Sequence, residues 1–261
     1  AYEIGVRLVG SEMCIRDRDY MAEVKVAATI APQDIIDNET LNSINDNHAY
    51  IDIIELRIDQ WESHHHELLM KNLSLLNEIK DHFKILVTYR TISQGGKGQL
   101  TNKEYLQLIE TISSIDECQM IDIEWESNIE VETHKRIIEN AHRHQKQIIV
   151  SYHNFLETPP LEELKFTYYK MQKLNPEYVK IAVMPKEKQD VAMLLEAVAY
   201  TSEAISQQVI GISMSHLGLV SRTAQGVFGG TVSYGCLGEP QAPGQIHVKE
   251  LKKQLLFYES M

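Results

Sequence analysis

The feature of this sequence that most constrains its fold is a regular alternation between short apolar segments and longer segments of helical period. Eight segments are typical of buried strands, because each is a short run rich in β-branched residues. They comprise residues 24–31, 50–59, 83–91, 120–126, 147–155, 178–185, 209–215 and 231–236. Helical spacing predicts helices over 68–80, 105–112, 134–144, 161–174, 188–206 and 248–258, with a short one at 223–228.

This alternation predicts the fold class. Repeated βα units place parallel strands side by side with helices outside them, and eight such units close a barrel. We therefore expect an α/β fold, a (β/α)8 TIM barrel in a single domain. An open doubly wound sheet is the alternative, but no G-x-G-x-x-G motif follows the first strand.

Composition limits the kinds of binding partner and the cellular compartment that fit this chain. A formal net charge of −12 disfavours nucleic acid as a partner. No apolar run approaches the ~20 residues of a membrane span. The cysteines Cys14, Cys118 and Cys236 are few, odd in number and without metal-ligand spacing. They indicate a cytoplasmic protein without disulfides or a zinc site.

Residues 1–20 differ from the rest of the chain. They lack the apolar core of a signal peptide and show no clear period. The run at 10–18, GSEMCIRDR, resembles a translated sequencing-adaptor read. We expect residues 1–20 to be a non-native or disordered leader and residues 21–261 to form the catalytic barrel.

Lys180 is the first candidate for chemistry, because it lies inside the apolar segment 178–185. Side chains alternate along a strand, so Lys180, Ala182 and Met184 share one face. If that face is interior, burial lowers the pKa of the amine and frees its lone pair to attack a carbonyl carbon. The competing interpretation is an edge or surface lysine, and Lys25 lies in a similar local pattern.

Polar side chains recur late in six of the eight predicted strands, where a barrel carries its active site. Surface ion pairs would explain each strand singly, but not strands that are covered on both faces. His153 falls at a level similar to Lys180 on the neighbouring strand, so a base is expected near the amine. The polar residues are Glu55, Arg57, Asp59, Arg90, Asp122, Glu124, Glu126, Ser151, His153 and Lys180, and Arg222 follows the seventh strand in a loop.

The segments that carry these residues match a known family in their order. They are 55–59 (ELRID), 89–91 (YRT), 151–155 (SYHNF), 179–182 (VKIA), 221–222 (SR), 227–229 (VFG) and 242–245 (APGQ). From about residue 24 to its C-terminus the chain resembles type I 3-dehydroquinate dehydratase, the shikimate-pathway lyase. The resemblance implies a (β/α)8 barrel, usually a homodimer, that works without a cofactor or a metal ion.

The resemblance also implies a reaction, the dehydration of 3-dehydroquinate to 3-dehydroshikimate in aromatic amino acid (chorismate) biosynthesis. Lys180 would form an imine with the C3 ketone, and His153 would act as general base and then general acid. Arg222 would hold the substrate carboxylate. The other residues implied to bind substrate or line its pocket are Glu55, Arg57, Arg90, Met214, Tyr234, Gln241, Ala242 and Gln245, the last three in or beside a Gly/Pro-rich stretch, 235–244, that resembles a closing lid.

Two positions depart from the family's pattern. Many relatives carry glutamate four residues after the arginine of strand three, where this chain has Gln94. Gln94 cannot be a charge partner, so hydrogen bonds or another acid, such as Glu124, would have to position His153. Some relatives carry serine at the position of Gln241, and we expect little change because both side chains can contact a hydroxyl group.

Three other motifs carry weaker signals. His64, His65 and His66 are adjacent, so their side chains do not converge on a metal ion, and we expect a solvated helix start. The glycine pair at 95–96 predicts loop freedom and a close backbone approach. The pair at 229–230 lies where barrels often bind phosphate.

Two other functions are compatible with the residues. A class I aldolase or transaldolase also uses a barrel lysine that forms an imine, and it would favour phosphate near Gly229 over a carboxylate clamp of Arg222 and Gln245. A non-catalytic barrel used for binding or assembly would keep Lys180 and His153 as structural residues.

Overall fold

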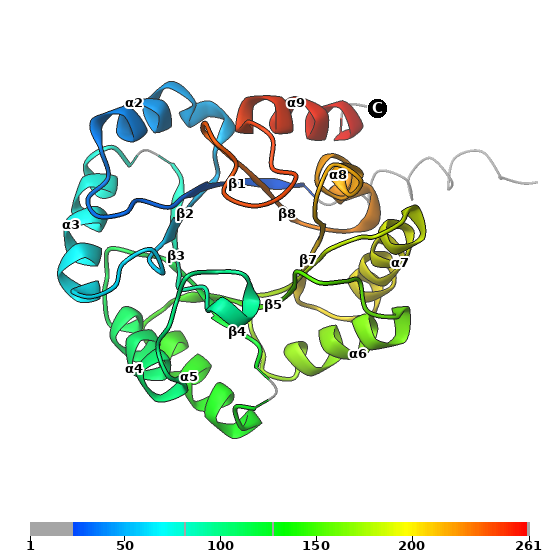
Figure 1. Ribbon diagram of the computed structural model, residues 1–261, viewed down its shortest axis with the longest axis horizontal. Coiled ribbons are helices and arrows are strands. Elements are labelled where there is room, and N and C mark those ends of the chain that lie inside the picture. The colour runs from blue at the N-terminus through cyan, green and yellow to red at the C-terminus, as the bar shows by residue number, and fades with distance from the viewer. Residues whose placement is uncertain (1–22, 81, 127, 260–261) are drawn as a thin grey trace, which may run out of the picture.

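The computed structural model describes residues 23–80, 82–126 and 128–259, and the expected leader at 1–20 lies outside them. Eight strands form its centre (Figure 1). Their bounds are β1 Lys25–Ile30, β2 Ile53–Arg57, β3 Lys84–Thr88, β4 Met120–Glu124, β5 Gln147–Asn154, β6 Tyr178–Val183, β7 Gln208–Ser213 and β8 Val232–Gly235. Each lies within the segment predicted for it or starts one residue before it.

The strands pair in parallel in the order β7-β6-β5-β4-β3-β2-β1-β8. The two ends of this sheet meet beside Val209, whose carbonyl accepts the backbone N–H of Thr231 at 3.0 Å and which bridges to Gly230. The sheet is therefore a nearly closed barrel, as predicted, and the open doubly wound alternative is wrong.

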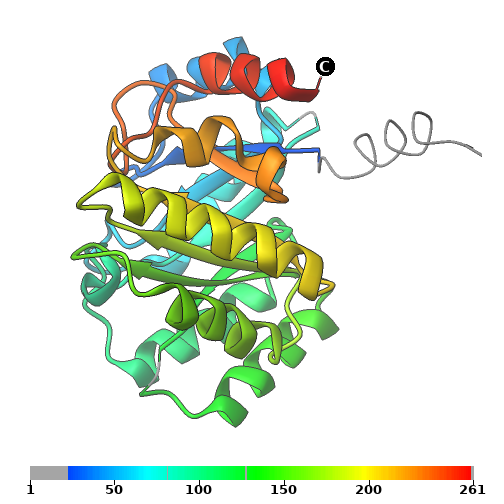
Figure 2. The same ribbon diagram turned by 90° about the vertical axis from the view of Figure 1, so that its right-hand side faces the viewer.

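Helices surround the barrel in a ring (Figure 1). Seen from the side, α6 and α7 lie along the outside of the strands (Figure 2). Within the described ranges, no helix has the length and apolar character needed to cross a membrane. The α-helices are α2 Asn38–Asp46, α3 His65–Glu78, α4 Asn102–Ser113, α5 Val131–Arg143, α6 Leu161–Gln172, α7 Lys188–Ala204, α8 Leu219–Thr223 and α9 Val248–Glu259, and the 3-10 helices are η1 His48–Tyr50, η2 Ile92–Gln94 and η3 Gln225–Phe228.

Two helical regions differ from the prediction. Helix α2 was not expected, because Leu41 and Ile44 are the only apolar residues among its nine. Its start is fixed by Asp37, whose side chain accepts the N–H of Thr40 at 2.7 Å. The predicted helix at 223–228 is wrong. Helix α8 ends at Thr223, and a 3-10 turn follows and ends at Gly229, whose φ of 80° suits glycine.

The apolar core has two parts, one between strands and helices and one inside the barrel. Helix α7 shows the first, since it buries Val191, Leu194, Ala197 and Val198 toward the sheet. The interior part forms a floor that closes the barrel toward the amino ends of its strands. Toward the carboxyl ends, many of the inward side chains are polar. The floor consists of Ala27, Ile53, Leu86, Met120, Ile149, Tyr178, Ile210 and Val232.

Candidate active site

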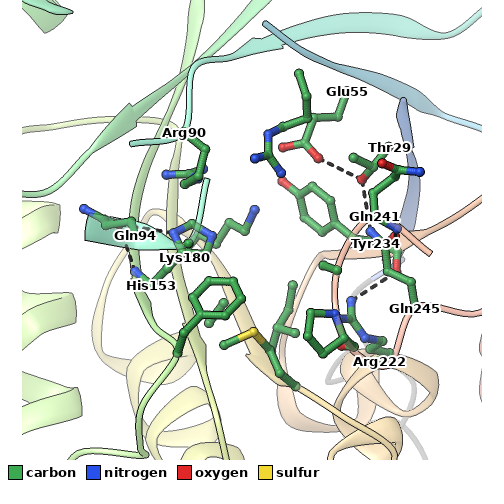
Figure 3. A pocket seen from close by; sticks show the side chains of 18 residues that line it. Thr29, Glu55, Arg90, Gln94, His153, Lys180, Arg222, Tyr234, Gln241 and Gln245 are labelled. Carbon is green, nitrogen blue, oxygen red and sulfur yellow. Dashed lines mark hydrogen bonds between the residues drawn. The ribbon is translucent and has the colours of Figure 1, made fainter. Parts of the chain in front are cut away.

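A pocket of about 220 Å³ lies above this floor, at the carboxyl ends of the strands (Figure 3). The strand register brings inward side chains of neighbouring strands to this level; Lys180, for example, pairs with Ser151 on one side and Ile210 on the other. Every residue predicted for the site lines the pocket. These residues are Glu55, Arg57, Arg90, His153, Lys180, Met214, Arg222, Tyr234, Gln241, Ala242 and Gln245.

The Lys180 side chain is buried, at 4% exposure, on β6. No described residue accepts a hydrogen bond from its amine, and Nζ lies 3.8 Å from the centre of the Tyr234 ring. Burial lowers the pKa of Lys180 to about 8, while Glu55 and Asp122 act in the opposite direction. The amine can therefore exist in its nucleophilic form near neutral pH.

His153, on β5, is held from behind by Gln94. The side-chain oxygen of Gln94 accepts the backbone N–H of His153 at 2.9 Å and lies 3.2 Å from its Nδ1 atom. Burial, followed by the charges of Arg90, Lys180 and Arg57, lowers the pKa of His153 well below its usual value. The imidazole is therefore neutral at pH 7 and can act as a base.

The arginines on β2 and after β3 are already neutralised by acids. Arg57 makes two hydrogen bonds to Asp59, at 2.7 and 2.9 Å. Arg90 contacts Asp122 at 2.8 Å and Glu124 at 2.9 Å. Glu124 is thus bound to Arg90 and does not position His153. Instead, His153 is positioned by the hydrogen bonds that Gln94 accepts.

Arg222 differs from these arginines because it faces the pocket without an acidic partner among the described residues. It lies in α8 rather than in a loop, and it is 1% exposed. Its guanidinium donates to the carbonyls of Tyr234 at 3.1 Å and Pro243 at 3.0 Å, and its Nε has no hydrogen-bond partner in the described part of the chain. Burial lowers the pKa of Arg222 to about 10, so the charged form is destabilised until an anion joins it.

The stretch after β8 forms one wall of the pocket. The Gln245 side-chain oxygen accepts the backbone N–H of Gln241 at 2.8 Å, and its amide donates to Thr29 at 3.1 Å. Thr29 in turn donates to Glu55 at 2.8 Å, so it links this wall to β2. Closure of the stretch over a ligand stays a prediction.

Sequence reasoning missed several lining residues. Thr29 carried a signal, because it is the only polar residue between 26 and 31, but one threonine in an apolar strand did not stand out. Phe155 packs against Gly95, where an added Cβ would lie 2.1 Å from the ring. The missed residues are Thr29, Gly95, Phe155, Ile212 and Pro243, whereas Ala182 lines the pocket as its place on the face of Lys180 indicated.

Other motifs take no part in this pocket. The described residues contain no group of three or more His, Cys, Asp or Glu that could hold a metal ion. His64 and His66 are exposed at the start of α3, as predicted, whereas His65 is half-buried and packs on the rings of Trp61 and Tyr89.

The expectation for the glycine pair at 229–230 is wrong. Gly230 bridges to Val209 at the start of β7, so the pair lies at the end of the barrel opposite to the pocket. An added Cβ on Gly229 would lie 2.1 Å from Ser202, and one on Gly230 would lie 2.3 Å from Gln225. The close packing of this turn leaves it no part in phosphate binding at the active site.

Comparison with known sequences agrees with the family resemblance of the motifs. The sequence model of a family described as Type I 3-dehydroquinase matches residues 34–260. A protein of Staphylococcus haemolyticus (strain JCSC1435) named 3-dehydroquinate dehydratase is 63% identical over 238 residues, which cover 91% of this chain and 99% of that protein.

Solved structures are similar over nearly the same range. A type I 3-dehydroquinate dehydratase of Clostridium difficile, with covalently modified comenic acid, is 29% identical with a TM-score of 0.83, covering 93% of this chain and 95% of that one. A 3-dehydroquinate dehydratase of Geobacillus kaustophilus HTA426 is 25% identical with a TM-score of 0.83, covering 91% and 92%.

Proposed function

The chain belongs to the type I 3-dehydroquinase family, and we propose that Lys180 and His153 carry out the family's reaction in the pocket at the carboxyl ends of the strands. The enzyme dehydrates 3-dehydroquinate to 3-dehydroshikimate in the shikimate pathway. The observation that carries the residue assignment is the meeting of a buried amine of lowered pKa, a neutral imidazole and an unneutralised arginine in one pocket.

Lys180 begins the reaction. Its neutral amine attacks the C3 carbonyl carbon of 3-dehydroquinate, and loss of the carbonyl oxygen as water, with one proton taken up from solvent, leaves a protonated imine. This cation withdraws electrons from the neighbouring carbon and makes the C2 proton more acidic. The lowered pKa of Lys180 supplies the free amine, and burial keeps bulk water from competing with it.

His153 then transfers the proton. It takes the C2 proton, and the C–H electrons form an enamine by flowing into the imine. The enamine electrons return to expel the C1 hydroxyl group, which leaves as water with the proton that His153 now carries. Hydrolysis of the product imine releases 3-dehydroshikimate and restores Lys180.

Arg222 binds the substrate carboxylate in this account. Its guanidinium is buried and already held by two backbone carbonyls, so it is oriented before the anion arrives. Glu55, Arg57 and Gln245 lie across the pocket, where they reach the substrate hydroxyl groups. The apolar surfaces of Met214 and Ala242 complete the lining.

The geometry does not favour the aldolase alternative. An aldolase of this kind would favour a phosphate site near Gly229, but Gly229 lies at the end of the barrel opposite to the pocket. Conversely, the buried guanidinium of Arg222, which has no acidic partner among the described residues, supports a carboxylate receptor that an aldolase does not need. A non-catalytic barrel is disfavoured as well, because it has no use for a buried amine without a hydrogen-bond partner in the described part of the chain.

Two further features belong to this proposal. We infer a cytoplasmic enzyme, because Cys118 and Cys236 are buried and free, as expected in a reducing compartment. We infer a homodimer from the resemblance to the family. Sedimentation equilibrium of the purified full chain tests the second inference, and a monomer at micromolar concentration would contradict it.

The experiment for the function is a direct assay. Adding 3-dehydroquinate to the purified protein should produce ultraviolet absorbance from the conjugated double bond of 3-dehydroshikimate. Lys180→Met should show none while keeping the wild-type circular dichroism. Conversion by Lys180→Met at the wild-type rate would remove Lys180 from the mechanism.

A further inference from the structure

The side-chain amide of Gln94 is fully used, and this fact fixes its orientation. Gln94 is 3% exposed. Its oxygen faces the backbone N–H of His153 at 2.9 Å, and its nitrogen donates to the carbonyl of Trp125 at 3.1 Å and to Glu126 at 3.0 Å. A backbone N–H can only donate and a backbone carbonyl can only accept, so the two ends of the amide cannot be exchanged.

This orientation determines the tautomer of His153. The same Gln94 oxygen lies 3.2 Å from Nδ1, and an oxygen that only accepts requires a proton on that nitrogen. The neutral ring therefore carries its hydrogen on Nδ1, and its lone pair is on Nε2, on the side of the ring away from Gln94. Figure 3 shows the ring between Gln94 and Lys180.

Glu126 completes the chain of contacts. Its carboxylate accepts from Gln94 and also from the Ser93 hydroxyl at 3.1 Å. A hydrogen bond to a carboxylate is stronger than one to a neutral acceptor, and polarisation of the amide strengthens the next bond in the chain. Glu126 thus supplies a hydrogen-bond acceptor that fixes the position of the amide in contact with His153.

We propose that Glu126 is a positioning residue, which acts through Gln94 to hold His153 in the Nδ1–H tautomer with Nε2 available as the base. The tautomer follows from hydrogen-bond geometry alone, whereas its kinetic consequence rests on the function proposed above. Glu126 does not line the pocket that holds Lys180, so it acts on the reaction only through its neighbours.

Many charged groups face this ring, and the test must separate Glu126 from them. Arg57, Arg90 and Lys180 act on His153 directly. Glu126 is distinct because its link to the ring is a defined pair of hydrogen bonds through Gln94. Glu55 and Arg222 line the same pocket as His153, and Asp122 and Glu124 are bound to Arg90. Glu163 and Lys170 of α6 line a second hollow that His153 also borders.

The first test needs no substrate. Nitrogen-15 NMR of protein labelled in histidine, with the His153 signals assigned by their loss in His153→Asn, should show a protonated Nδ1 and an unprotonated Nε2 at neutral pH. Gln94→Ala should raise the population of the opposite tautomer, and Glu126→Ala should raise it to a smaller extent, because the Trp125 carbonyl still holds the Gln94 amide. Glu126→Gln keeps an acceptor at this position and should remain close to the wild type.

Kinetics provide the second readout. Glu126→Ala should lower kcat by about tenfold with little change in KM, because the base is misplaced but binding is not. Glu126→Gln should recover most of this loss, and Glu132→Ala, which removes an exposed acid on α5, should have no effect. A wild-type ring with its proton on Nε2, or a Glu126→Ala enzyme with the wild-type tautomer and kcat, would overturn the proposal. If the wild type had no dehydratase activity, the proposed function would be refuted, but the tautomer of His153 found by NMR would still stand.

Discussion

The Nζ atom of Lys180 lies 3.8 Å from the centre of the Tyr234 ring, directly over its face. The electron-rich face of the ring favours the ammonium form, whereas burial favours the neutral amine. Burial lowers the pKa of Lys180 to about 8, and the ring face acts in the opposite direction. Tyr234 therefore limits how far the pKa of Lys180 is lowered.

This balance predicts a pH dependence of imine formation. The neutral amine is the reactive form, so the trapping rate should rise with pH and level off above about 8. Tyr234→Leu removes an attraction for the cation worth about 0.5–2 kcal/mol, so it should move the curve to lower pH. Tyr234→Phe keeps a ring face and is the matched control. Rates of borohydride trapping over a pH series measure this, and a shift of the Leu variant to higher pH would contradict the reasoning.

Removing the base should separate the two chemical steps. His153→Ala should still form the imine, because attack needs only the amine, but it should stall before the C2 proton is lost. Mass spectrometry of the variant with 3-dehydroquinate should show the substrate adduct accumulating on a folded protein. Absence of an adduct, with wild-type circular dichroism, would show that His153 is needed for attack as well.

Arg222 should be the main determinant of carboxylate binding. A charge-assisted hydrogen bond contributes about 1.5–3 kcal/mol, so Arg222→Gln should raise KM by roughly tenfold to a hundredfold. The KM of Arg222→Lys should lie between those of the wild type and Arg222→Gln, since a point charge cannot fully replace the guanidinium fork. Arg136→Gln, which breaks an exposed ion pair with Glu110, is the control and should be neutral. An unchanged KM in Arg222→Gln would place the carboxylate elsewhere.

Installing a carboxylate at position 94 should change the titration of His153. An adjacent negative charge favours the imidazolium and raises its pKa, so Gln94→Glu should move the acidic limb of kcat/KM to higher pH. The new carboxylate would also face Glu126, which opposes its ionisation. The shift should therefore be larger when Glu126→Gln is added. If the limb stays in place or moves to lower pH in both variants, it belongs to another group.

Much of this structure is predictable from alternation in the sequence. The strand pattern predicts the barrel, and the period of two places Lys180 and His153 on inward faces, because neither depends on distant contacts. Helix α2 could not be found in this way, since Asp37 and a single buried isoleucine define it. The family resemblance, rather than any pattern, indicated Gln241 and Gln245.

The remaining features depend on contacts between segments far apart in the chain. Thr29 belongs to the site only because Gln245 and Glu55 meet at its hydroxyl group. The role of the glycine pair at 229–230 was misjudged because composition does not show at which end of the barrel a segment lies. The pair precedes β8 and bridges to the start of β7, at the end opposite to the pocket. The partner of Gln94 is Glu126, which follows β4, and the sequence indicated it only as one of the polar residues late in a predicted strand.

The most direct test of the account is to find which lysine forms the imine. Borohydride reduction with 3-dehydroquinate, followed by peptide mass spectrometry, should place the label on Lys180 and on no other lysine. Lys25 is the internal control: it lies in a similar sequence pattern, but at the opposite end of the barrel, where its amine contacts the Tyr178 hydroxyl at 3.4 Å. Labelling that is lost in Lys180→Ala and kept in Lys25→Ala is the predicted result. A label on Lys25, or one that survives Lys180→Ala, would contradict the assignment.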